Sequence, residues 1–122
     1  MGLTYIIIGM VGTNVAIGLW LGWGFLKRQP RSRVLVGVHL IIGLSMLEVL
    51  AVMLKTATDS GNAAALPLAQ IASGLLAAAL LTGFAGPVLS QSKPGTRAPI
   101  LAAHATVALA AFGMVLWWAA RV

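Results

Sequence analysis

The two histidines of the chain, His39 and His104, both lie inside long apolar segments. A polar side chain at such depth in a membrane is costly, and it usually faces the interior of a helix bundle. A neutral imidazole binds a metal through one ring nitrogen while the other nitrogen donates a hydrogen bond. Two imidazoles that approach one point from opposite sides form a ligand pair, so these residues are the strongest candidates for chemistry in the sequence.

The residues before each histidine predict that the two lie at equal depth. A basic turn precedes both, with six residues from Arg33 to His39 and seven from Arg97 to His104. At a rise of about 1.5 Å per residue, each imidazole lies roughly 9–10 Å beyond its arginine. The order of apolar helix, basic turn and histidine-containing helix thus repeats weakly, and it predicts two parallel helices with their histidines at one level.

The composition indicates which elements must position this pair. Of the 122 residues, 60% are hydrophobic and 8% are charged. Soluble domains carry about 25% charged residues, so most of this chain must face lipid or other protein. A helix that crosses a membrane needs about 20 apolar residues. We predict an all-α, up-down-up-down bundle of four transmembrane helices, a single membrane domain over residues 1–122, with helices at about 3–26, 34–54, 65–89 and 98–120.

Polar segments and prolines predict where these helices end. We expect turns at residues 55–62 and 90–96. Pro87 is expected to kink or end the third helix, because proline lacks the N–H that an interior helical position donates.

Basic residues predict the topology. Of the eight Lys and Arg residues, six belong to the first and third turns. An excess of Lys and Arg marks the cytoplasmic side. We therefore expect an integral protein of a bacterial inner membrane, with cytoplasmic basic loops and periplasmic termini. The net charge of +6 is interpreted as this topology signal, and no nucleic-acid partner is expected.

A haem b is the cofactor that the histidine pair fits best, because its iron takes one axial nitrogen from each side of the macrocycle. Arg33 and Arg97 lie toward the cytoplasm and are candidates to pair with the haem propionates. Gly43 and Ala108 each lie one turn below a histidine, where a larger side chain would clash with the macrocycle.

The ring nitrogen that does not bind the metal needs a hydrogen-bond acceptor, which also fixes the orientation of the ring. The backbone carbonyl four residues earlier on the same helix would serve. We therefore expect Leu35 to accept from His39 and Ile100 to accept from His104.

This arrangement resembles the cytochrome b561-like and related small four-helix membrane b-type cytochromes, in which histidines on helices two apart clamp a haem. The resemblance rests on His39 and His104, their preceding arginines and the four-helix plan. It implies iron-bound haem b and an electron-transfer subunit of a larger redox complex. The second histidine pair of the usual two-haem pattern is missing, and one haem near one face cannot relay an electron across about 30 Å of bilayer. A second centre in a partner subunit is therefore implied.

Other interpretations of the pair stay open. One histidine per magnesium would suffice for chlorophyll or bacteriochlorophyll in a photosynthetic complex. The histidines would equally serve a cofactor-free structural or assembly subunit through interhelical hydrogen bonds, or handle protons. The sequence shows no nucleophile with a matching base and no acidic cluster, so we do not expect an enzyme that acts alone.

Glu48 is the one acidic residue inside a predicted helix interior. It follows His39 by nine residues, which at about 100° per residue places it on the opposite helix face. We expect it to contact a partner membrane subunit; binding a quinone oxygen or remaining protonated are the alternatives.

Overall fold

A computed structural model describes residues 2–122, with every side chain in that range except those of Ser90 and Pro94. These residues form four long helices and one short 3-10 turn. They are α1 (Gly2–Leu26), α2 (Arg33–Asp59), α3 (Ala65–Ser92), η1 (Pro94–Thr96) and α4 (Arg97–Ala119). No strand occurs among the described residues, and the predicted all-α class is confirmed.

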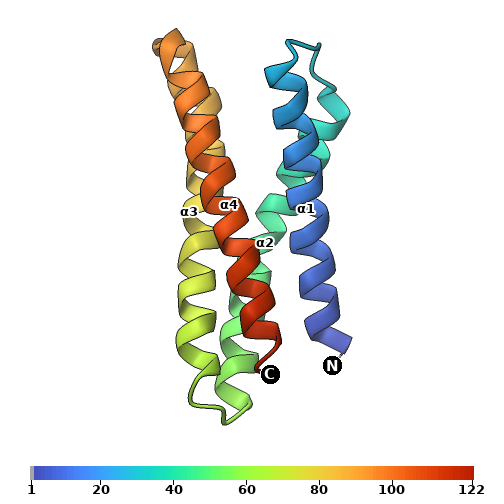
Figure 1. Ribbon diagram of the computed structural model, residues 1–122, viewed down its shortest axis with the longest axis vertical. Helices are drawn as coiled ribbons and strands as arrows, with labels where there is room; N and C mark the ends of the chain where they lie inside the picture. Colours follow the sequence, from blue (N-terminus) through green and yellow to red (C-terminus); the bar gives the residue numbers. More distant parts are fainter. Residues whose placement is uncertain (1) are drawn as a thin grey trace.

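The helices alternate in direction and form two hairpins that stand side by side (Figure 1). Along the chain each helix packs on the next, and α4 also contacts α1, which closes the ring of four. Each helix is long and apolar enough to cross a membrane. Large apolar side chains such as Trp20, Ile41 and Leu81 are exposed on the outside, where lipid would cover them. The chain is an integral membrane protein with the predicted up-down-up-down bundle.

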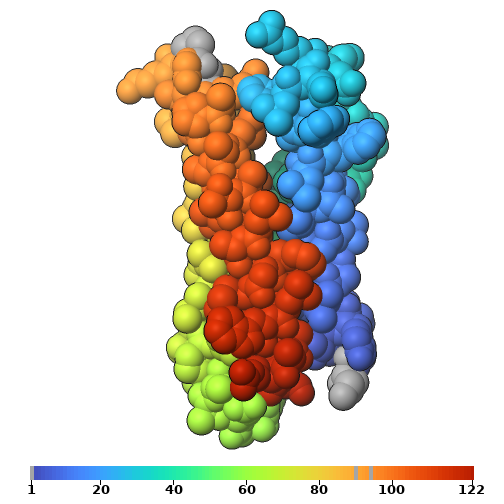
Figure 2. Space-filling model, viewed as in Figure 1, coloured from blue at the N-terminus to red at the C-terminus, as the bar shows by residue number. Residues whose placement is uncertain are grey.

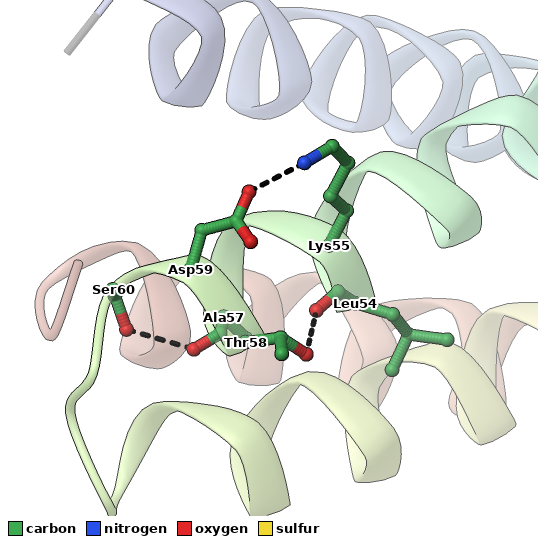
Figure 3. Close-up of polar contacts among 6 residues, drawn as sticks. All are labelled: Leu54, Lys55, Ala57, Thr58, Asp59 and Ser60. Carbon is green, nitrogen blue, oxygen red and sulfur yellow. Dashed lines mark hydrogen bonds and ion pairs between the residues drawn. The ribbon is translucent and has the colours of Figure 1, made fainter.

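Helix α2 is longer than predicted, because it ends at Asp59 rather than near residue 54. Lys55 Nζ donates to Asp59 Oδ2 at 2.6 Å, one turn further along the helix. Thr58 Oγ1 donates to the carbonyl of Leu54 at 2.9 Å, so this side chain also returns to the helix (Figure 3). Pairs of opposite charge at i and i+4 stabilise helices. The expected turn at residue 55 is therefore wrong, since these polar side chains satisfy one another on the helix surface.

Helix α3 also extends beyond its predicted end. Pro87 lies inside it, and the helix continues to Ser92. Proline removes one backbone donor, but packing against neighbouring helices can hold such a segment helical in a membrane bundle. The contact between α3 and α4 is the most extensive one between described helices, and α3 also contacts η1, the turn that follows its C-terminal end.

The bundle has two unlike halves. One half carries the termini and the α2–α3 loop, and it contains the whole buried apolar cluster; we call it the packed half. Members of the cluster are Ile7, Val11, Met46, Val49, Met53, Ala57, Ala65, Ala69, Ala72, Leu76, Ala111, Val115 and Trp118. The other half carries the two basic turns, and we call it the open half. There the hairpins diverge (Figure 1), and the surface is hollowed between α4 and the α1–α2 hairpin (Figure 2).

Candidate functional site

A cavity of about 250 Å³ separates the two hairpins in the open half. All four helices contribute to its wall, and most of the lining residues are apolar. Four of the six site residues that the sequence singled out line it, namely His39, His104, Gly43 and Ala108. The structure thus gathers the predicted histidines and their small neighbours at one place.

The two histidines meet in this cavity, His39 from α2 and His104 from α4. Their ring centroids are 6.0 Å apart, and the ring planes are perpendicular, at 90°. Helices α2 and α4 run in the same direction (Figure 1), and the short distance between the rings places the pair at nearly one depth of the bundle.

Each histidine donates its Nδ1 proton to the backbone of the preceding helix. From His39 Nδ1 the distance to the carbonyl oxygen of Asn14 is 3.1 Å. From His104 Nδ1 the distance to the carbonyl oxygen of Ala79 is 2.8 Å. A carbonyl oxygen only accepts, so Nδ1 carries the proton in both rings and Nε2 of the neutral ring has the free lone pair. Among the described residues neither Nε2 atom has a hydrogen-bond partner, and both are free to bind a ligand.

These acceptors correct the expectation of Leu35 and Ile100. The imidazoles project from their own helices toward the interior of the bundle, so Nδ1 meets the backbone of α1 or α3 instead of its own helix. The two rings also differ in one respect. His104 Nδ1 lies 3.3 Å from Thr82 Oγ1, a second acceptor on α3.

Both hairpins build their part of the site by one pattern, offset by 65 residues. Positions 14 and 79 supply the carbonyls, positions 39 and 104 the histidines, and positions 18 and 83 are glycines that face the imidazoles. The cavity wall repeats in the same way. Equivalent lining residues are Val11 and Leu76, Val15 and Leu80, Gly43 and Ala108. Each hairpin therefore supplies one equivalent half of the site.

Positive charge lies at the mouth of the cavity, but the residues differ from the predicted pair. Arg31 lines the cavity, and its guanidinium lies over the ring of Phe25 at 5.6 Å from the centroid. Partial burial, and then the charge of Arg97, lower the pKa of Arg31. Arg33 is exposed at the first residue of α2 and does not line the cavity. Arg97 does not line the cavity either, but it lies close enough to Arg31 for the two charges to interact.

Glu48 is exposed on α2, outside the cavity wall, as its helical position predicts. The described residues contain one salt bridge, between Lys55 and Asp59, and Glu48 takes no part in it. A carboxyl group in the middle of a membrane-spanning helix therefore faces outward.

Five residues of the site were not assigned to it by sequence reasoning: Asn14, Gly18, Arg31, Thr82 and Gly83. One sequence signal could have found the glycines, because Gly18 and Gly83 each precede a histidine by 21 residues. Asn14 carries another mark of a polar site. Its Oδ1 is buried and has no hydrogen-bond partner among the described residues.

The donor set limits which metal group the site can hold. No group of three or more His, Cys, Asp or Glu residues occurs in the described part of the chain. Two imidazoles alone suit a metal whose other positions are filled by its own macrocycle. Comparison with protein-family models, with curated proteins and with solved structures finds no match to this chain.

Proposed function

We propose that this protein is a membrane b-type cytochrome that holds one haem b between His39 and His104. The arrangement of the two rings carries the proposal. Metal–imidazole bonds are about 2 Å long and the bonding nitrogen lies about 1 Å from the ring centre, so two imidazoles opposed on one metal have centroids roughly 6 Å apart. The centroids here are 6.0 Å apart, and both Nδ1 atoms are already committed to carbonyl oxygens.

The surroundings of the pair support the same group. A cavity of about 250 Å³ with mostly apolar walls adjoins both rings and would exclude water from a flat macrocycle. Gly43 and Ala108 are small residues and therefore leave space in the cavity beside the histidines. Arg31 at the mouth, with the charge of Arg97 close to it, would supply positive charge for the haem carboxylates. When bound, haem b supplies one-electron transfer, while the chain holds it, orients its ligands and keeps the site dry.

The proposal places the protein in a larger redox complex. One haem site close to one end of the bundle leaves most of the bilayer uncrossed, so the electron needs a second centre elsewhere. We propose that the α2 face around Glu48 contacts a partner subunit, because an outward carboxyl group in a membrane is costly until a donor covers it. We also propose a bacterial inner membrane with the basic turns on the cytoplasmic side.

A visible spectrum of the purified protein, oxidised and reduced, tests the haem. We expect the sharp α-band of a reduced bis-imidazole haem. His39→Ala and His104→Ala should each abolish it, and added imidazole should restore part of it by refilling the space of the lost ring. Thr106→Ala is the matched control, because Thr106 is exposed on α4 and bonds only to its own helix, at the carbonyl of Ala102.

A colourless preparation that stays colourless after haem is added would refute the proposal. Extraction with organic solvent separates the alternatives, because a chlorophyll-type pigment or a quinone would appear in the extract without a pyridine haemochrome. A normal haem band in both histidine variants would equally refute the assignment of the ligands.

A further inference from the structure

One glycine of the preceding helix faces each imidazole. A Cβ built on Gly18 would lie 3.0 Å from His39 Cε1, and one built on Gly83 would lie 3.0 Å from His104 Cε1. Optimal carbon–carbon contacts are about 3.5–4.0 Å. Any larger residue at these positions therefore pushes on the edge of the ring.

The same glycines uncover the carbonyls that hold the rings. Gly18 follows Asn14 by four residues, and Gly83 follows Ala79 by four. A helical side chain covers the turn that precedes its own Cα, so a side chain at position i+4 would shield the carbonyl oxygen of residue i. With glycine there, the oxygen keeps its helical hydrogen bond and still accepts the Nδ1 proton of a histidine from the next helix.

We propose that Gly18 and Gly83 are positioning residues that fix the planes of the two axial imidazoles at right angles to each other. Each ring is held at Nδ1 by a carbonyl, and the glycine four residues beyond that carbonyl leaves just enough space for its Cε1 edge. The hydrogen bond at Nδ1 and the limited space at Cε1 together determine the rotation of the ring about its bond to Cβ. The 90° between the planes follows from where α1 and α3 place these two edges. This inference rests on the proposed haem function.

Two other glycines provide matched controls. Gly9 and Gly74 lie on the same helices and are also 65 residues apart. A Cβ at either position meets no heavy atom within 4 Å. Replacement by alanine there changes helix propensity as it does at Gly18 and Gly83, but it touches neither imidazole.

The experiment compares Gly18→Ala, Gly83→Ala and the double variant with Gly9→Ala and Gly74→Ala. The readouts are haem content, the electron paramagnetic resonance spectrum of the ferric protein, which reports the angle between axial imidazole planes, and the midpoint potential. The wild type and both controls should share the strongly anisotropic low-spin spectrum of perpendicular planes. Gly18→Ala and Gly83→Ala should each shift that spectrum and the potential, and the double variant should shift them further or lose haem.

The outcomes separate this inference from the function on which it rests. A wild type that binds no haem refutes the proposed function itself. A haem-loaded wild type whose spectrum indicates parallel planes refutes only the positioning role, and this readout needs no variant to fold. The role is equally refuted if Gly18→Ala and Gly83→Ala match the controls in haem content, spectrum and potential. Loss of haem from these two variants, with full haem in both controls, supports it.

Discussion

The packed and open halves of the bundle contain similar residue types but differ in how closely these residues pack. In the packed half, Met53, Val115 and Trp118 fill the centre and are fully buried. In the open half, the two histidines, small residues such as Gly43 and Ala108, and larger apolar residues such as Phe25 and Leu80 surround a cavity. The same four helices therefore form a solid core at one end and a cavity at the other, where the two hairpins diverge (Figure 1).

The largest effect should come from breaking the packed half. Trp118→Ala removes a side chain that is 0% exposed. Truncation of a buried tryptophan costs about 3–5 kcal/mol of unfolding free energy, because it leaves a void. Thermal or denaturant unfolding in detergent should show this loss. Trp118→Phe is the control and should cost far less, because Trp118 Nε1 has no acceptor among the described residues and no hydrogen bond is lost.

The contrast between the halves becomes sharper when the same substitution is made in each. Ala111 is fully buried in the packed half, and Ala108 lines the cavity one turn away on α4. Ala111→Leu should destabilise the fold by about 1–3 kcal/mol through overpacking. Ala108→Leu should leave the melting temperature of the haem-free protein nearly unchanged and reduce haem content. The comparison fails if both variants lose stability alike.

Within the open half, the hydrogen bonds of the two histidines should contribute unequally to haem binding. His104 has Thr82 as a second acceptor, whereas the equivalent position on α1, 65 residues earlier, is Ile17. Thr82→Val should weaken haem binding by roughly 2- to 10-fold, because the loss of one hydrogen bond costs about 0.5–1.5 kcal/mol. Measured haem dissociation checks this. Ile17→Val is the matched control, and an equal loss there would contradict the role of Thr82.

The smallest expected effect concerns the charges at the mouth of the cavity. Arg31→Gln should weaken haem binding by up to about fivefold, since exposed ion pairs contribute about 0–1 kcal/mol, and the difference should shrink in high salt. Arg33→Gln should change it less, because Arg33 does not line the cavity. Haem titration at low and high ionic strength compares the two. A larger effect of Arg33→Gln would restore the sequence prediction.

Much of the fold follows from composition. Four apolar segments separated by basic or polar turns predict four helices that alternate in direction. Two turns separate the second helix from the fourth, so these two helices are parallel. The meeting of His39 and His104 follows from that parallel pair and the matched spacing after Arg33 and Arg97. These features depend only on position along each helix.

The finer contacts depend on how the helices rotate and pack against one another, which spacing within one helix does not determine. For this reason the carbonyls of Leu35 and Ile100 were expected, while those of Asn14 and Ala79 accept the protons. The conformation of a turn is equally hard to predict from the sequence: Arg28, in the turn after α1, has a φ of 55°, and Arg31 rather than Arg33 reaches the cavity.

Because each hairpin supplies a single imidazole, neither one presents a complete ligand pair. A group bound by both rings would link the two hairpins at the end where they diverge (Figure 1). Binding to the closed arrangement alone stabilises it in proportion to ligand concentration and affinity. If the proposed haem is that group, chains without it should be the first to open at this end.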